Sequence, residues 1–215
     1  MFISDRDLVV YEPNLFRDAG WLGQKLGEDV VSIAGTTMTA LTMNFISAGV
    51  EAGHVVTLEQ ASYEVVQRLS ATTLQVSRIR GKRDGMAIAP PATAAGNARF
   101  WTLSPQIGLA HAQVLRMIGL DSAGAGALGA GATVLDESRV TNPEDLSRLE
   151  ALLTLHTVYS ALAALRSADD PFSLRAEMYR QRAREERQRA VAYIDTDFDG
   201  RADVCRRLNA VVLSR

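Results

Sequence analysis

The sequence predicts a mainly helical α+β protein, in which a small antiparallel β subdomain is inserted into a helical bundle and an extended arm closes the chain. Three observations lead to this fold class. Three segments begin with a helix-capping side chain directly before proline, residues 29–82 are rich in β-branched residues with a period of two, and residues 195–215 combine an acidic turn with an alternating segment. With 215 residues, 47% of them hydrophobic, the chain is long enough to bury a core of its own.

Residues 1–28 are assigned to the helical bundle, together with residues 100–194. Pro13 favours an extended conformation at Glu12. From residue 14 to residue 26, apolar side chains recur at near-helical spacing, which predicts a short helix.

Residues 29–82 are expected to form the β subdomain, with about four or five strands. Valine, isoleucine, threonine and tyrosine alternate with other residues between glycines and serines, and the alternation is clearest at residues 72–79. Residues 81–103 contain Pro90-Pro91 and many alanines and glycines, which favours a loop.

Helices are predicted over residues 104–119, 142–167 and 171–194. Ser104, Asn142 and Asp170 each offer a capping oxygen and precede a proline, whose missing N–H costs nothing in the first turn of a helix. Each segment also carries an apolar stripe at helical spacing, so the three helices are expected to pack as one bundle. Residues 121–139 are rich in glycine and alanine and are expected to form a flexible loop.

The acidic turn at residues 195–203 has the most distinctive pattern. Carboxylates occupy positions 1, 3, 5 and 9 around Gly200: Asp195, Asp197, Asp199 and Asp203. With the carbonyl of Arg201, this pattern favours a weak structural Ca²⁺ site. However, Arg206 stands where a helix-loop-helix calcium site has its bidentate glutamate. The alternative is a metal-free turn in which the carboxylates bind their own backbone and Arg206 and Arg207 balance their charge. Apart from this possible ion, no cofactor is expected.

The C-terminal arm is expected to take part in assembly. Residues 204–213 alternate like a strand that must find an edge to pair with, so residues 200–215 are expected to order only against a neighbour. The arginine-rich helix is either a solvated surface or a docking face for an acidic partner. The residues predicted to bind partners are Arg180, Arg184, Arg187, Arg206, Arg207, Leu208, Val211 and Leu213.

Little in the sequence favours an enzyme. Cys205 is the single cysteine, which excludes an internal disulfide and a multi-cysteine metal site. His111 and His156 lie on the apolar faces of their predicted helices, where a histidine is more typical of a core than of a catalytic site. We find no apolar stretch of the ~18 residues that a membrane span needs, and we expect synthesis in the cytoplasm.

Three stretches resemble virion structural proteins of tailed phages and phage-like gene transfer particles: residues 5–17 (DRDLVVYEPNLFR), residues 53–56 with 70–77 (GHVV and SATTLQVS), and residues 193–209 (YIDTDFDGRADVCRRLN). Within that group the chain looks most like the head–tail adaptor, also called the head-completion protein. The resemblance implies a helical bundle without enzymatic activity, located at the head–tail junction of the virion.

The same resemblance implies a ring, usually of twelve copies, beneath the portal protein. Such a ring docks its C-terminal arms into the portal, contacts a tail, stopper or nozzle protein and extends the channel through which DNA passes. A protein of another class remains as an alternative, namely a virion surface or tail accessory protein, or adhesin, that Ca²⁺ stabilises through the acidic turn.

Overall fold

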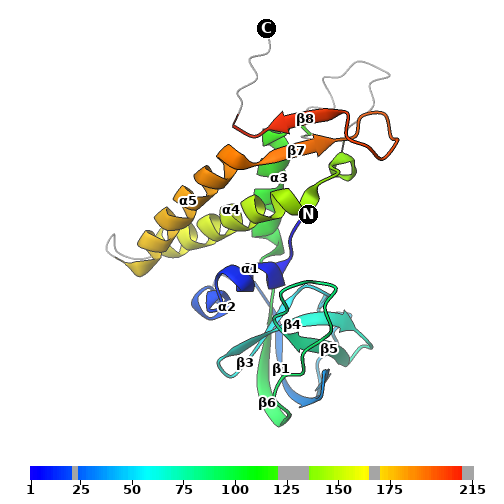
Figure 1. Cartoon of the computed structure of the whole chain (residues 1–215). Coiled ribbons are helices and arrows are strands. Elements are labelled where there is room, and N and C mark those ends of the chain that lie inside the picture. The colour runs from blue at the N-terminus through cyan, green and yellow to red at the C-terminus, as the bar shows by residue number, and fades with distance from the viewer. Residues whose placement is uncertain (21–23, 121–135, 165–169, 210–215) are drawn as a thin grey trace. The chain divides into compact units, whose positions relative to one another are not determined.

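The computed structural model describes residues 1–20, 24–120, 136–164 and 170–209 (Figure 1). Two compact units divide the chain: a barrel unit, Ser4–Ser104, and a helical unit, Met1–Ile3 with Pro105–Arg215. Of the described residues, 37% are helical and 27% lie in strands. The predicted mainly helical fold class is therefore wrong, because half of the chain is organised around a closed β-barrel rather than inserted into a bundle.

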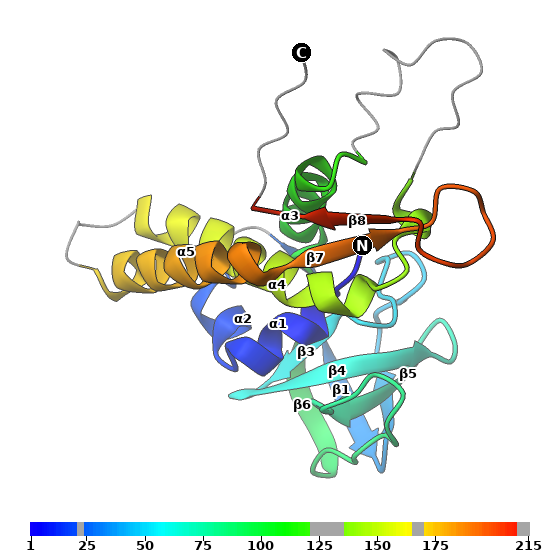
Figure 2. The ribbon, with the colours of Figure 1, turned by 45° about the horizontal axis from the view of Figure 1, so that its top comes forward.

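The barrel consists of six antiparallel strands (Figures 1 and 2). They are β1 (Lys25–Ala34), β2 (Thr37–Ala40), β3 (Val55–Leu58), β4 (Ala61–Arg68), β5 (Thr73–Arg78) and β6 (Thr93–Trp101). The strand order is β1-β2-β5-β4-β3-β6, and pairing of β6 with β1 closes the sheet. Closure leaves no unpaired edge along the barrel.

Strand β6 lies in the segment that the sequence predicted as a loop. It pairs with both β1 and β3, so it supplies the closing contacts of the barrel. Its small residues allow a close approach: a Cβ atom at Gly96 would lie 2.7 Å from Cδ1 of Leu58. Gly96, one of the small residues that suggested a loop, is therefore a position where the side chain of Leu58 on β3 leaves no room for a Cβ atom.

Alternating side chains of the strands fill the barrel. Phe45 and Phe100 meet edge to face at its centre, with ring centroids 5.1 Å apart, and Met38 and Leu74 are completely buried beside them. Outside the barrel, α1 (Asp5–Tyr11) packs against β4 and α2 (Leu15–Asp18) against β3. Residues 4–20, which the sequence assigned to the helical bundle, thus belong to the barrel unit.

A buried charge cluster attaches α1 to the barrel. Glu64 is completely buried, and its Oε2 lies 2.8 Å from Nε of Arg6 in an ion-pair contact. Its Oε1 accepts hydrogen bonds from the backbone N–H and from Nε–H of Arg80. Arg6 also donates to the carbonyl of Arg80. One carboxylate therefore holds two nearly buried arginines, one from α1 and one from the segment after β5.

The helical unit contains α3 (Ser104–Met117), the 3-10 turn η2 (Glu137–Arg139), α4 (Pro143–Ala164), α5 (Pro171–Arg189), β7 (Val191–Ile194) and β8 (Val204–Arg207). The three predicted helix starts are confirmed, and Asp170 caps α5 by accepting a hydrogen bond from the Phe172 N–H. The third helix ends earlier than predicted, because residues 191–194 form β7. Of the predicted flexible loop 121–139, residues 121–135 lie outside the described residues.

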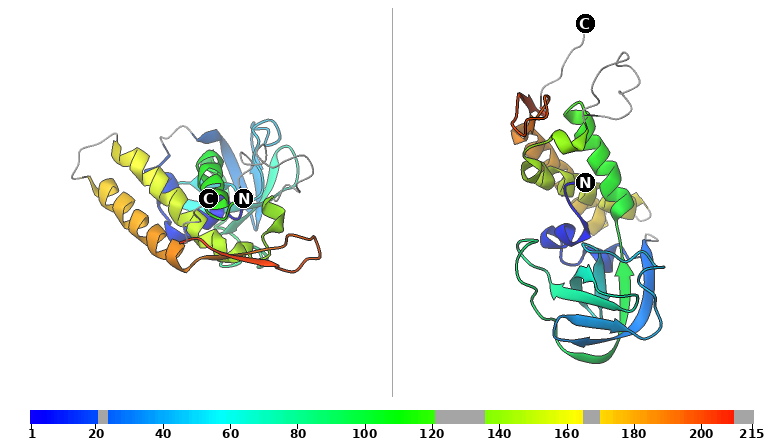
Figure 3. Two further views of the ribbon diagram at one scale, coloured as in Figure 1. Left: turned by 90° about the horizontal axis from the view of Figure 1, so that it is seen from above. Right: turned by 90° about the vertical axis from the view of Figure 1, so that its right-hand side faces the viewer.

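Helices α4 and α5 form the main pair of this unit and run side by side in opposite directions (Figure 3). Tyr159 of α4 stacks on Tyr179 of α5 with ring centroids 5.6 Å apart.

The two strands after α5 form an antiparallel hairpin, in which Val191 faces Arg207 and Ile194 faces Val204. The prediction that residues 200–215 lack a partner within their own fold is therefore wrong for β8. Val211 and Leu213 lie outside the described residues.

None of the helices in the described part of the chain combines the length and the apolar character needed to cross a bilayer.

Candidate functional site

The acidic turn is the loop of the β7–β8 hairpin, and two of its carboxylates hold the loop together. Asp195 is buried, and its two oxygens accept hydrogen bonds from the backbone N–H groups of Phe198 (2.7 Å) and Gly200 (3.0 Å). Asp203 accepts from both the N–H and the hydroxyl of Thr196, at 2.8 and 2.9 Å. These bonds match the interpretation in which aspartates bind their own backbone.

The structure brings three of the four predicted metal ligands together. Carboxylate oxygens of Asp195, Asp197 and Asp203 lie within 4.8 Å of one another. Asp199 is not in this group, and its Oδ1 accepts a hydrogen bond from the backbone N–H of Arg201 at 2.7 Å. A Ca²⁺ ion prefers six to eight oxygen ligands, so three carboxylates supply part of a coordination shell.

The electrostatics of the turn differ from one carboxylate to the next. Burial raises the pKa of Asp195, but the N–H groups of Gly200 and Phe198 outweigh burial and leave that pKa below its ordinary value. The N–H of Asp199 lowers the pKa of Asp197, but desolvation and the neighbouring carboxylates outweigh it, so the pKa of Asp197 is raised. Among Asp195, Asp197 and Asp203, Asp197 is thus the carboxylate whose pKa is raised.

The arginine that faces the turn is Arg139, which the sequence analysis did not single out. Its guanidinium lies 3.1 Å from the centroid of the Phe198 ring, and its Nη1 is 3.9 Å from Oδ2 of Asp195. Arg206, expected to balance the acidic turn, instead donates to the carbonyl of Ile118 just after α3. Arg139 is far from the turn in sequence, so no local pattern could have revealed it.

The predicted partner-binding residues fall into different environments. Arg180 and Arg184 are exposed on α5, where Arg180 pairs with Glu177 at 2.7 Å. Arg187 donates to the carbonyl of Leu208 at 2.9 Å, and Leu208 is buried, so this leucine packs within the unit. Arg207 is exposed on β8. Exposed arginines therefore lie on both α5 and the hairpin.

The two helical histidines serve packing in this structure. His111 is nearly buried, with Nδ1 2.9 Å from Oε2 of the completely buried Glu150 and with Nε2 bonded to Glu137. His156 lies 3.1 Å from the carbonyl of Ala176, across the α4–α5 contact. Both are bonded as core histidines are, in line with the sequence interpretation.

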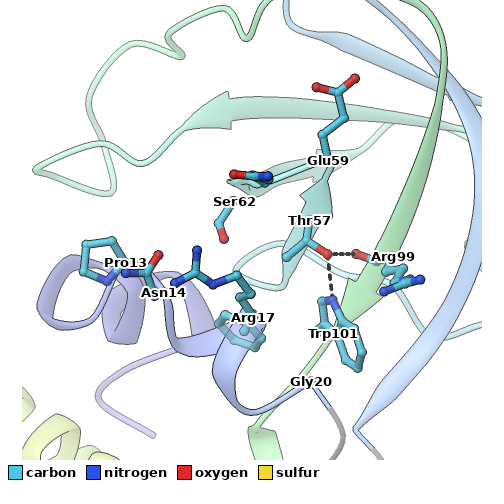
Figure 4. A pocket seen from close by; sticks show the side chains of 11 residues that line it. Pro13, Asn14, Arg17, Gly20, Thr57, Glu59, Ser62, Arg99 and Trp101 are labelled. Carbon is cyan, nitrogen blue, oxygen red and sulfur yellow. Dashed lines mark hydrogen bonds between the residues drawn. The ribbon is translucent and has the colours of Figure 1, made fainter.

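A pocket opens on the wall of the barrel between α2, the β3–β4 turn and β6 (Figure 4). It encloses about 350 Å³. Trp101 closes one side and donates from its indole N–H to the hydroxyl of Thr57 at 2.8 Å. The lining residues are Pro13, Asn14, Phe16, Arg17, Gly20, Thr57, Glu59, Gln60, Ser62, Arg99 and Trp101.

Comparison with protein-family models, curated proteins and solved structures found no match.

The pocket was not predicted because two of the three elements that line it were assigned wrongly from the sequence. Strand β6, which supplies Arg99 and Trp101, was predicted as a loop, and α2 was assigned to the helical bundle. The pairing of β6 with β3 is what places Trp101 beside the β3–β4 turn. A site assembled from elements that far apart in sequence becomes visible only when the barrel is closed.

Proposed function

We propose that this chain is a structural, non-enzymatic protein of a tailed-phage-like particle, a head–tail adaptor that forms a ring between the portal and the tail. The sequence resemblance supports the proposal, and the exposed basic helix α5 is the structural observation that carries it. This helix contains six arginines and three glutamates, and its buried residues are Ala176, Tyr179 and Ala183. One face packs on α4, and Arg180, Arg184 and Arg189 are exposed on the rest of the helix.

A helix of this kind suits assembly because arginine pairs with carboxylates in a fixed, two-pronged geometry. Complementary charge steers partners together and fixes their register more than it adds affinity. The β7–β8 hairpin adds the exposed Arg207 to the same unit. The closed barrel is not part of the helical bundle that the resemblance implies, so the proposal rests on α5 and the hairpin and not on the fold.

Reversing the charge of α5 should weaken portal attachment. We expect the full chain to co-sediment as a ring with the portal protein of the same particle, and Arg180→Glu/Arg184→Glu to bind the portal at least about tenfold more weakly, because like charges across an interface repel. Lys82→Glu, an exposed reversal in the barrel unit, should bind as the unmodified chain does. Affinity comes from sedimentation velocity with purified portal, and folding from circular dichroism. Unchanged portal binding by the double variant would refute the proposal.

The acidic turn supports a second candidate, the Ca²⁺-stabilised surface or tail accessory protein. The observation that favours it is the group of three carboxylates whose oxygens lie within 4.8 Å of one another. An ion held there would lower the mutual repulsion that raises the pKa of Asp197. It would also stabilise the folded chain by mass action, since the unfolded chain has no such site.

Millimolar Ca²⁺ should then raise the melting temperature by about 2–4 °C. Asp197→Asn should remove the increase, whereas Asp199→Asn should keep it, because Asp199 lies outside the carboxylate group. Calorimetric titration of the two variants, each against Ca²⁺ and against Mg²⁺, measures binding directly. If the unmodified chain gives no heat and no thermal shift, the turn is held by its backbone hydrogen bonds alone.

A further inference from the structure

The lining of the barrel pocket contains two arginines, Arg17 and Arg99, against one carboxylate, Glu59, and both arginines make only long ion-pair contacts. Side chains of Arg17 and Arg99 are 61% and 63% exposed. Arg17 reaches Asp18 at 3.8 Å and Arg99 reaches Glu28 at 3.5 Å, distances at which exposed pairs contribute little. Both guanidinium groups can therefore turn to an incoming carboxylate at small cost.

Polar side chains without a hydrogen bond to other described residues line the same pocket. They belong to Asn14, Gln60 and Ser62. The indole N–H of Trp101 is already satisfied by Thr57, which leaves Trp101, Phe16 and Pro13 as the apolar part of the lining. Figure 4 shows Arg17 and Asn14 on one side of the space and Arg99 with Trp101 on the other. The pocket thus combines an apolar wall with donors for an anion.

The tip of the acidic turn has the complementary chemistry. Phe198 is 49% exposed although it is aromatic, and its backbone has a positive φ of 74°, a conformation that is strained for a bulky residue. The exposed carboxylates of Asp197 and Asp199 flank it. One face of the ring lies against Arg139, so the ring is held outward in a fixed position.

We propose that the barrel pocket binds the Asp197–Asp199 tip of a second copy of this chain. The Phe198 ring enters the pocket against Trp101, and the two carboxylates face Arg17 and Arg99. The contact is heterologous, since the pocket of one copy meets the turn of the next, and contacts of this type build rings. The inference rests on the proposed ring and names the contact between neighbouring subunits within it.

Charge swapping tests the contact in the full chain, kept in EDTA so that no Ca²⁺ neutralises the turn. Self-association measured by sedimentation velocity should weaken at least about tenfold in Arg17→Glu/Arg99→Glu, and equally in Asp197→Lys/Asp199→Lys. Mixing the two variants should restore association, because each then offers the charge that the other needs. Lys82→Glu should associate as the unmodified chain does.

Two further variants change the charge or the volume of the pocket. Glu59→Gln removes the carboxylate of the lining and should strengthen association about two- to fivefold, as expected for one exposed charge. Ser62→Trp fills the pocket without changing its charge and should prevent association. Circular dichroism and the melting temperature show which variants are folded, and Ser62→Trp decides the question if a charge reversal fails to fold.

The inference is overturned if the unmodified chain does not self-associate, or if folded pocket variants associate normally. The two proposals fail separately. A ring that binds the portal and is insensitive to the pocket variants refutes only this contact. Association that depends on the pocket, in a protein that neither closes into a ring nor binds the portal, refutes only the adaptor function.

Discussion

Glu64→Ala is expected to destabilise the barrel unit by about 3–5 kcal/mol, a large fraction of the roughly 5–15 kcal/mol that stabilises a folded domain. The carboxylate of Glu64 is completely buried and is shared by Arg6 and Arg80, which are 4% and 8% exposed. Without it, Arg80 loses its carboxylate partner in a desolvated site, and Arg6 keeps only the longer contact of its Nη1 with Oδ1 of Asp7, at 3.7 Å. The attachment of α1 to β4 should be lost first, since Arg6 is its polar anchor.

Urea unfolding followed by tryptophan fluorescence and circular dichroism measures this loss. Glu28→Ala is the matched control, because Glu28 also faces a lysine and an arginine, Lys25 and Arg99, but with a largely exposed side chain. The control should change the unfolding midpoint very little, since exposed ion pairs contribute little to stability. Similar midpoints for both variants would show that burial of the Glu64 cluster does not govern the stability of the barrel.

The starts of α3, α4 and α5 could be predicted because their signals are local, whereas α1 was not predicted and the helix expected at residues 14–26 is reduced to α2. An N-cap followed by proline fixes a helix start within two or three residues, and the starts of α3, α4 and α5 follow that rule. The closed barrel could not be predicted in the same way. Its closure depends on β1 pairing with β6 across about seventy residues, and the local composition of β6 resembles a loop.

The candidate sites show the same difference between local signals and contacts over a long sequence separation. The hydrogen bonds of the turn at residues 195–203 agree with one of the two interpretations of its sequence, because they span only a few residues, and the Ca²⁺ site stays a prediction. Two contacts were not predicted: Arg139 lies over Phe198, and Arg17 and Arg99 line one pocket. Each contact joins segments that only the folded chain brings together. For Arg206 a contact was predicted that the structure does not show. It is close to the turn in sequence, but it donates a hydrogen bond to the carbonyl of Ile118.

Asp5 is a buried carboxylate without an opposing charge of its own. It is 1% exposed, its Oδ1 accepts the N–H of Leu103 at 2.7 Å, and its Oδ2 has no hydrogen-bond partner among the described residues. Burial raises the pKa of Asp5 from 3.8 to about 7, against the opposing effect of the Leu103 hydrogen bond. The folded chain therefore binds this proton more tightly than the unfolded chain does.

The direction of the pH dependence follows from linkage. Below pH 4 the residue is protonated in both states, and the folded barrel carries no buried charge from it. As the pH rises from about 4 to about 7, the unfolded chain loses the proton before the folded chain does, so stability falls. A rise in pKa from 3.8 to about 7 corresponds to a total loss on the order of 4 kcal/mol, which is complete above pH 7.

Asp5→Asn should therefore be about as stable as the unmodified chain near pH 4 and more stable at pH 8, by up to roughly 4 kcal/mol. Asparagine keeps an oxygen for the Leu103 N–H and cannot ionise. The measurement is the difference in unfolding free energy between the two proteins from pH 4 to pH 8. Taking the difference cancels the contribution of His54, whose pKa is lowered by burial and whose effect on stability has the opposite dependence on pH.

Asp5→Ala separates the two roles of this residue. It also removes the charge but leaves the Leu103 N–H unsatisfied, so its stability should lie below that of Asp5→Asn at every pH. A difference between Asp5→Asn and the unmodified chain that does not vary with pH would show that Asp5 has the same pKa in the folded and unfolded chain.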